Sequence, residues 1–377
     1  MKAWKLFAKV LVVLALLVLV LLAATWGVLR LPAFGGTWEG ARLARMQQSP
    51  QFHNGRFENT PPYVSNMSLL RELHDFLGDE VREPTFEIPV LKMSADDLAR
   101  PVVPGLRSWW LGHASVLVEL DGVRILTDPV LSQRASPFQF VGPARLHPVP
   151  LPLEQWKNID AVVISHDHFD QLDMNTIAHL AQDGTQFYVG LGIGAHLERW
   201  QVPAAQIHEM DWWEQAVIKG VTIHCTPARH YSGRTSMNNS TLWASWMIQG
   251  PQHSLYYSGD TGYADHFKAI RARLGAPNLA LIKVGAYGDT WMDIHMNPES
   301  AIQAHQDLGA DTLLPVHWAT FNLAYHDWAA PVVRTLAAAK AQGIRVVTPR
   351  VGEKFVWGQP FDNQPWFQAP KRPEPAA

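Results

Sequence analysis

The chain has 377 residues, of which 47% are apolar and 17% are charged, and its formal net charge is -3. This composition excludes a disordered chain and argues against a general nucleic-acid binder, which needs an excess of basic residues. The single cysteine, Cys225, excludes an intrachain disulfide and a cysteine zinc cage, whereas 17 histidines direct attention to metal sites built from histidine and aspartate.

The N-terminus carries a long apolar segment. Lysines at positions 2, 5 and 9 precede an apolar run over residues 10–28, which at 1.5 Å per residue spans a bilayer of roughly 30 Å. The alternative is a cleaved signal peptide, but its apolar core is shorter, and Leu22 occupies a cleavage-site position that requires a small residue. We predict a single-pass anchor over residues 1–30 in the inner (cytoplasmic) membrane of a bacterium, with the lysines in the cytoplasm and the rest of the chain in the periplasm.

The remainder of the chain divides into three parts. Residues 31–100 are interpreted as an irregular arm that packs on the main domain and contains a short helix over residues 68–77. Residues 101–360 form the main domain. The Pro-rich segment 361–377 is predicted to be a disordered tail.

The main domain is predicted to alternate between strands and helices. Residues 109–120 and 123–127 form a hairpin that turns at Asp121-Gly122. The apolar run 161–164 is typical of a strand buried on both faces, and a helix follows over 173–181. Further strands are predicted at 187–189, 221–225, 242–248, 255–258, 279–284, 312–315 and 345–347, and further helices at 264–274, 298–308 and 328–342. Strands outnumber helices, and the helices fall late in each half, which fits two mixed sheets packed face to face with helices outside. Composition and periodicity do not by themselves fix that topology.

Side chains that bind metals follow several of these strands. His166, His168 and Asp170 come directly after strand 161–164, and imidazole and carboxylate are suitable zinc ligands. Three more residues of this type follow later strands: His230, Asp260 and His317. A single His-x-His segment is equally compatible with an ordinary polar loop. The recurrence after successive strands favours a metal site, since ligand sites tend to lie at strand ends.

The histidine segment resembles the His-x-His-x-Asp-His signature of the metallo-β-lactamase fold superfamily. Within that superfamily, the chain is similar to the N-acylphosphatidylethanolamine-hydrolysing phospholipase D family and its bacterial relatives, over roughly residues 50–360. The segments that carry this closer similarity are WLGHA (110–114), LTDP (126–129), SQRASP (132–137), GDTGY (259–263) and HWATF (317–321).

The resemblance implies an α/β (α+β) fold, the four-layer αββα sandwich, with two zinc ions between the sheets. The ligands it implies are His166, His168 and His230 for the first zinc, Asp170 and His317 for the second, and Asp260 for both. Gln171 stands where the family motif has a histidine. Because an amide oxygen is a weaker ligand than imidazole, the second metal is expected to be loosely held, exchanged or absent unless His113 or His295 substitutes.

The resemblance also implies a phospholipase D-type hydrolase of N-acylphosphatidylethanolamine-like phospholipids. Zinc lowers the pKa of bound water from about 15.7 to about 7, and we expect the resulting hydroxide to attack phosphorus. Asp170 and His295 are the predicted catalytic residues. Asp170 positions the water or binds the second zinc, and His295, in a segment that matches one beside the family's active site, lies near the substrate phosphate.

Two alternative functions remain open. One is a metallohydrolase of the same fold that acts on a soluble lactone or phosphodiester, since a fold does not fix a function. The other is a metal-poor, non-catalytic scaffold in which Gln171 marks a decayed site. Trp212, Trp213 and Trp291 are compatible either with a lipid-facing rim or with core packing.

Overall fold

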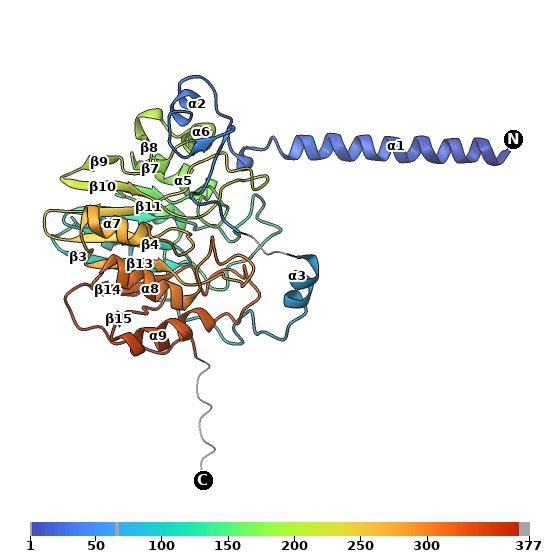
Figure 1. The fold of residues 1–377 in the computed structure, drawn as a ribbon. Coiled ribbons are helices and arrows are strands. Elements are labelled where there is room, and N and C mark those ends of the chain that lie inside the picture. The colour runs from blue at the N-terminus through green and yellow to red at the C-terminus, as the bar shows by residue number, and fades with distance from the viewer. Residues whose placement is uncertain (1, 65–67, 369–377) are drawn as a thin grey trace, which may run out of the picture.

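The computed structural model describes residues 2–64 and 68–368 and contains two large mixed sheets that share one core (Figure 1). From edge to edge, the first sheet contains β16 (Lys354–Val356), β3 (Leu106–Gly112), β4 (Ser115–Leu120), β5 (Val123–Thr127), β6 (Ala161–Ile164), β7 (Gln186–Gly190) and β8 (Ile207–Met210). The second contains β15 (Arg345–Val346), β14 (Thr312–Val316), β13 (Leu279–Lys283), β12 (Ser254–Tyr257), β11 (Ser245–Gln249), β10 (Val221–Thr226) and β9 (Gln215–Ile218).

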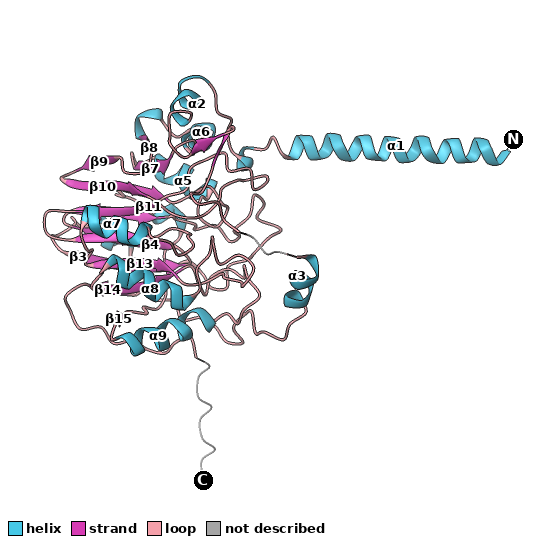
Figure 2. Cartoon of the chain, viewed as in Figure 1, coloured by secondary structure: helices cyan, strands magenta, loops and turns pink. Residues whose placement is uncertain are grey.

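Helices cover the outer face of each sheet (Figure 2). The first sheet is covered by α5 (Met174–Ala181) and α6 (Gly194–Arg199). The second is covered by α7 (His266–Leu274), α8 (Pro298–Leu308) and α9 (Ala330–Gln342), which contact one another in that order. The predicted four-layer αββα arrangement is therefore confirmed.

The three central strands of the first sheet, β4, β5 and β6, are buried on both faces. In β4, Val116 and Val118 point into the core between the sheets, whereas Leu117 packs with Leu180 of α5 and Leu197 of α6. Because alternate side chains of a strand point to opposite faces, two apolar layers produce an uninterrupted apolar run. This explains why the strand at 161–164 could be predicted from sequence.

The predicted hairpin is present between β4 and β5, but the prediction of one continuous strand over residues 109–120 is wrong. Residues 106–120 form two antiparallel strands, β3 and β4, which reverse at His113-Ala114. Gly112 and His113 have φ values of 100° and 51°, which let the chain turn inside an apolar run that contains no Pro or Asp-Gly signal. The turn places His113 at the end of the sheet where the ligand-type residues gather.

The N-terminal segment forms the long helix α1 (Lys2–Val28), which extends away from the sandwich (Figure 1). Within its part Trp4–Val28, an 18-residue stretch has a mean hydropathy of 3.1, and none of that stretch is buried. It is long and apolar enough to cross a membrane, a property shared by membrane anchors and signal sequences. The periplasmic location of the catalytic domain stays a prediction.

The arm contains α2 (Gly40–Met46), the hairpin of β1 (Phe52–His53) and β2 (Arg56–Phe57), α3 (Leu69–Phe76) and α4 (Ala95–Ala99). Its side chains contact the sandwich at several points. The Trp38 indole donates to the carbonyl of Gly192 at 2.8 Å, and the Asn59 amide donates to the carbonyl of His230 at 2.7 Å. Residues 65–67 lie outside the described residues, and the boundary of the arm at residue 100 stays a prediction.

The predicted disordered tail is wrong for residues 361–368. Trp366 and Phe367 are buried in the main core, and the Trp366 indole donates to the carbonyl of Thr348 at 3.1 Å. The prediction followed from the proline content of this segment and did not take Trp366 and Phe367 into account. Burial of these two large aromatic side chains stabilises an ordered conformation of the segment. Residues 369–377 lie outside the described residues.

Candidate metal centre

Loops from both sheets bring the candidate ligands to one edge of the sandwich. His166 follows β6 of the first sheet, whereas His230, Asp260 and His317 follow β10, β12 and β14 of the second. Gly259 allows two of these loops to approach closely. It has a φ of +55°, and a Cβ at this position would lie 2.4 Å from the Ser165 Cβ, so a larger residue would push Asp260 away from His166.

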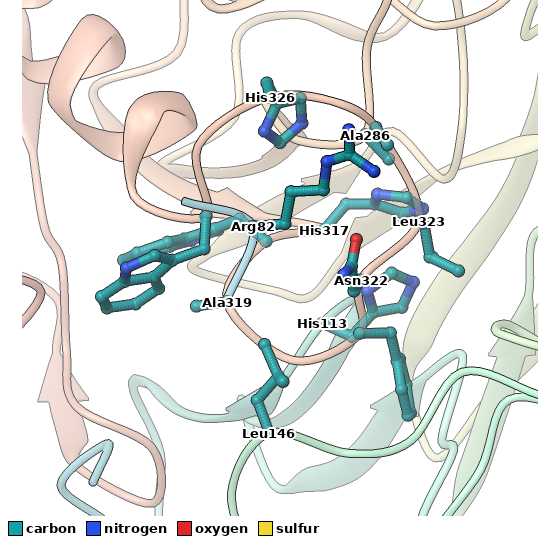
Figure 3. Close-up of a pocket in the computed structure, with 13 residues that line it drawn as sticks. Arg82, His113, Leu146, Ala286, His317, Ala319, Asn322, Leu323 and His326 are labelled. Carbon is teal, nitrogen blue, oxygen red and sulfur yellow. The ribbon is translucent and has the colours of Figure 1, made fainter. Parts of the chain in front are cut away.

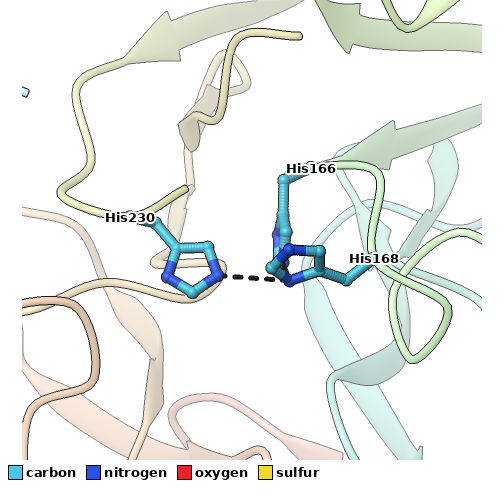
Figure 4. A group of neighbouring side chains, drawn as sticks. All are labelled: His166, His168 and His230. Atoms are coloured by element: carbon cyan, nitrogen blue, oxygen red, sulfur yellow. Dashed lines mark hydrogen bonds between the residues drawn. The ribbon is translucent and has the colours of Figure 1, made fainter. Parts of the chain in front are cut away.

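The first group consists of His166, His168 and His230, whose ring nitrogens lie within 4.8 Å of one another (Figure 4). His166 Nε2 lies 2.8 Å from His168 Nδ1, and His230 Nε2 lies 3.4 Å from the same atom. These are the ligands predicted for the first metal. Burial, followed by the neighbouring His168, lowers the pKa of His166 to about 3, so its imidazole is neutral and can donate a lone pair.

The second group consists of His113, Asp170 and His317. Asp170 Oδ2 lies 3.0 Å from His113 Nε2 and 3.4 Å from His317 Nε2. Figure 3 shows His113 and His317 converging on a small cavity that Arg82 and His326 also line. His113, one of the two substitutes considered for the missing motif histidine, therefore lies beside both predicted ligands of the second metal.

Asp260 lies between the two groups. Its Oδ2 atom is 3.0 Å from His317 Nε2, 3.9 Å from His230 Nε2 and 4.0 Å from His166 Nε2. Its Oδ1 atom is buried and has no hydrogen-bond partner among the residues that the structure describes. This position is compatible with the bridging role that the resemblance implied, which stays a prediction.

Gln171 is fully buried in the same cluster. Its Nε2 atom lies 3.4 Å from both Asp260 Oδ2 and His113 Nε2, and its Oε1 atom is buried without a hydrogen-bond partner. The orphan oxygens of Gln171 and Asp260 would be costly without a cation or donor to satisfy them. The donor set is therefore of the kind that holds a metal, with His113 able to provide the imidazole that Gln171 lacks.

The charges of the cluster also favour a cation. Burial raises the pKa of Asp260 and Asp170, but the neighbouring histidines outweigh burial and hold both carboxyls well below the usual pKa range. Burial lowers the pKa of His317, but the two carboxylates outweigh burial and raise this pKa to about 9. The carboxylate pair thus stabilises a positive charge at this point, whether a proton on His317 or a metal ion.

A hydrogen-bonded layer that the sequence analysis did not identify supports the first group. Asp128 accepts hydrogen bonds from the Ser165 backbone N–H at 2.7 Å, from the Ser165 hydroxyl and from the Tyr257 hydroxyl. Ser165 Oγ lies 2.9 Å from His166 Nδ1, so the chain of contacts ends on a predicted ligand. The segment LTDP, which contains Asp128, carried part of the family resemblance and was the available signal.

A second buried pair holds the histidine loop. Asp167, between His166 and His168, lies 3.2 Å from His196 Nε2 and accepts from the Gly233 backbone N–H at 2.7 Å. Arg234 donates to the Asp167 carbonyl at 2.8 Å. These contacts fix the backbone between the two histidines.

His295 belongs to a third group of possible ligands, with His230 and Asp260. Its Nε2 atom lies 3.9 Å from Asp260 Oδ2, and the Trp291 ring packs against it at a centroid distance of 4.8 Å. His295 also lines the pocket described next. Its assignment to the substrate phosphate stays a prediction.

A pocket of about 620 Å³ opens above the candidate ligands. Its floor contains His168, Asp170, Asp260, His295 and His317. Its walls are mainly apolar and include Phe169, Tyr231, Met237, Trp291, Ile294, Leu323 and Tyr325. Such a pocket suits a ligand with an apolar body and a polar reacting group. Trp212 and Trp213, considered above for a lipid-facing rim, pack against the cores instead.

Comparisons with known proteins identify the family of the chain. Residues 123–318 match the family model described as a β-lactamase superfamily domain. An uncharacterized protein of Mycobacterium tuberculosis is 42% identical over 358 residues, which cover 92% of this chain and 96% of that protein. The N-acyl-phosphatidylethanolamine-hydrolyzing phospholipase D 1 of Caenorhabditis elegans is 36% identical over 269 residues, which cover 68% of this chain and 75% of that protein.

Solved structures show the same fold. A metallo hydrolase from the archaeon Ignicoccus hospitalis superposes with a TM-score of 0.52 and 23% identity, covering 68% of this chain and 99% of its own. The isothiocyanate hydrolase from Delia radicum gut bacteria superposes with a TM-score of 0.55 and 19% identity, covering 67% of this chain and 99% of its own. The chain therefore belongs to the β-lactamase superfamily, as a metal-dependent hydrolase related to the N-acyl-phosphatidylethanolamine-hydrolysing phospholipases D.

Proposed function

We propose that the chain is a zinc-dependent phosphodiesterase that hydrolyses N-acylphosphatidylethanolamine-like phospholipids to phosphatidic acid and an N-acylethanolamine. The observation that carries this proposal is the pocket of about 620 Å³, which combines a floor of metal-ligand side chains with apolar walls. The 36% identity to a phospholipase D of this specificity supports the same substrate class. A soluble lactone or a small phosphodiester would leave most of the apolar wall without a partner.

The proposed ligands form two sets. His166, His168 and His230 would hold the first metal, His113, Asp170 and His317 would hold the second, and Asp260 lies near both sets, with Gln171 beside the second. When bound, zinc supplies Lewis acidity, which lowers the pKa of water and offsets the negative charge that develops on the phosphoryl oxygens.

Asp170 is placed to orient the attacking water. His113 and His317 outweigh burial and hold its pKa well below the usual range, so the carboxylate is ionised and can accept a hydrogen bond that orients the attacking water. The water oxygen forms a bond to phosphorus, the bond from phosphorus to the ethanolamine oxygen breaks, and the departing alkoxide takes up the proton that the water releases, giving the N-acylethanolamine.

His295 is placed to bind a phosphoryl oxygen. Burial, followed by the nearby Lys283, lowers its pKa well below the usual range, so the ring is neutral. It lines the pocket, and its Nδ1 atom is buried without a hydrogen-bond partner. A neutral imidazole that donates to the phosphate would orient the substrate without repelling the metals.

The test compares three variants of the full chain, after zinc loading, on N-acylphosphatidylethanolamine in mixed micelles. Asp260→Asn and His168→Ala are expected to lose nearly all hydrolysis, whereas His179→Ala, on α5 away from the cluster, is expected to keep it. If the first two variants hydrolyse the lipid as well as the parent, the proposal is wrong. Activity on a soluble phosphodiester or lactone without activity on the lipid would favour the soluble-substrate enzyme, and failure to bind zinc would favour the scaffold.

A further inference from the structure

Helix α3 exposes an apolar face beside the mouth of the pocket. Leu70 is 80% exposed, and Leu73 and Leu77, which lie on the same face by their helical spacing, are exposed as well. A contiguous apolar patch of this kind on a protein surface marks a contact with another apolar body. The patch therefore requires an occupant.

Two contacts hold α3 over the pocket. Arg71 forms an ion pair with Asp289 at 3.0 Å, and the Phe76 ring lies 6.2 Å from that of Tyr325, which lines the pocket. The Arg82 guanidinium also packs over the Tyr325 ring, at 4.8 Å. The apolar face of α3 is thus part of the pocket rim.

The loop 138–141 exposes a second apolar site, and this loop lies between Ala135 and Pro143, which line the pocket. Phe140 is 81% exposed, and its neighbour Val141 is exposed too. The Phe140 ring contacts Phe138 at 5.3 Å, and Phe138 contacts Phe34 at 6.1 Å. Phe34 lies in the short segment that follows α1, so this loop sits next to the base of the apolar helix.

The base of α1 is joined to the metal centre as well. The Phe34 ring lies 6.1 Å from Phe169, which stands between the ligands His168 and Asp170 and lines the pocket. Arg234 donates to the Ala33 carbonyl at 2.8 Å, and the Trp200 indole donates to the Pro32 carbonyl at 2.7 Å. The end of α1 is therefore fixed to the edge of the domain where the pocket opens.

Residues at the end of α1 mark where a bilayer surface would lie. The Arg30 guanidinium packs over the Trp26 ring at 3.7 Å, and tryptophan and arginine both favour the membrane–water interface. Figure 1 shows α1 leaving the domain on the side where α3 projects. A membrane crossed by α1 would thus meet α3 and the loop 138–141.

We propose that α3 and the loop 138–141 form a membrane-docking surface that inserts into the interface of the bilayer crossed by α1. The pocket then opens toward lipid, and an amphipathic substrate enters from the membrane plane without crossing water. The occupant is lipid because α1 brings a bilayer to this rim, and amphipathic helices with large apolar side chains lie in such interfaces. This inference rests on α1 as an anchor and does not depend on the substrate proposed above.

The test uses one fluorescent probe at a time on the full chain in phosphatidylethanolamine–phosphatidylglycerol nanodiscs. Cys225 is fully buried, so a single cysteine introduced on the surface is the thiol that reacts with an environment-sensitive dye. Leu70→Cys and Phe140→Cys report on the docking surface. Val217→Cys is the matched control, because this apolar residue on β9 is 64% exposed and lies at the opposite edge of the domain (Figure 1).

Probes at positions 70 and 140 are expected to shift to shorter emission wavelength and to be quenched several-fold more by nitroxide headgroup lipids than the probe at 217. A Leu17→Cys probe within α1 reports separately whether the anchor is inserted. Equal quenching at 70, 140 and 217 with the probe at 17 in lipid overturns the docking surface and leaves the anchor intact. A water-exposed probe at 17 overturns both, and neither readout depends on hydrolysis.

Discussion

The backbone N–H of His317 donates to the carbonyl oxygen of His113 at 2.9 Å, although the two residues end strands of different sheets. Both have positive φ, 67° for His317 and 51° for His113. A non-glycine residue in this region costs about 1–3 kcal/mol, and such strain is typical of functional sites. The pair is therefore held in one arrangement across the sandwich, with its ring centroids 4.0 Å apart and Asp170 beside both.

This arrangement predicts that His113, and not Gln171, determines binding of the second metal. His113→Ala is expected to reduce zinc from about two ions per chain to about one, because a neutral imidazole is lost from a site that also contains Asp170 and His317. Gln171→Ala is expected to keep about two zinc ions per chain, since the Gln171 amide is a weaker zinc ligand than the His113 imidazole. Elemental mass spectrometry of the purified chains measures the ratio. Loss of one zinc from Gln171→Ala with retention in His113→Ala would reverse the assignment.

The contact of Asp128 with Ser165 predicts an effect on the first metal. Asp128→Asn is expected to lower zinc affinity by about 10–100-fold, because an amide NH₂ would replace one of the two oxygens that accept hydrogen bonds from Ser165 and Tyr257, and Ser165 would no longer be held against His166. Competition with a chromophoric chelator measures the affinity. Asp160→Asn is the control, since Asp160 precedes β6 and binds Lys219 at the far end of the strand. An Asp128→Asn affinity equal to that of the control would remove Asp128 from the metal centre.

The sequence predicted the layers of the fold and most of the cluster because both follow from short-range patterns. Buried strands read as apolar runs, and His166, His168, His230, Asp260 and His317 each follow one. The position of His113 was not predictable, because it depends on a reversal inside an apolar run and on a hydrogen bond to a residue in the other sheet. The burial of Lys283 was not predictable either, since a lysine at the end of an apolar strand ordinarily places its ammonium group in water.

Lys283 predicts an unusual pH dependence of stability. Its side chain is fully buried, and burial lowers its pKa from 10.5 to about 7 despite the nearby carboxylates of Asp260 and Asp170. Between these two values the unfolded chain binds more protons than the folded chain, so this group makes folding more favourable as pH rises. The destabilising contribution of the buried Lys283 has its full size below about pH 7 and disappears as the pH approaches 10.5.

Replacement of this lysine should therefore stabilise the chain in a pH-dependent manner. Lys283→Met is expected to raise the urea midpoint of unfolding at pH 7 and to raise it much less near pH 10. Lys340→Met, at an exposed position of α9, is expected to give a small difference that is the same at both pH values. A Lys283→Met difference that does not change between the two pH values would mean that the ammonium is not desolvated in the folded chain.

The aromatic stack behind His113 and His317 predicts that the C-terminal segment supports the metal centre. Trp366 packs on Trp318 at 5.0 Å, Trp318 packs on Trp110 at 5.1 Å, and the Trp110 indole donates to the carbonyl of His113 at 2.9 Å. That same carbonyl accepts the hydrogen bond from the His317 backbone. Removing Trp366 would leave a cavity beside the residue that follows His317.

Trp366→Ala is expected to lower the free energy of unfolding by about 3–5 kcal/mol, measured by urea denaturation of the zinc-loaded chain. It is also expected to weaken zinc binding, because the loops that carry His113 and His317 would lose their common support. Gln364→Ala, two residues away and exposed, should change neither quantity. A large loss of stability with unchanged zinc affinity would show that the stack serves the core alone and that the His113–His317 hydrogen bond is sufficient to hold the second group.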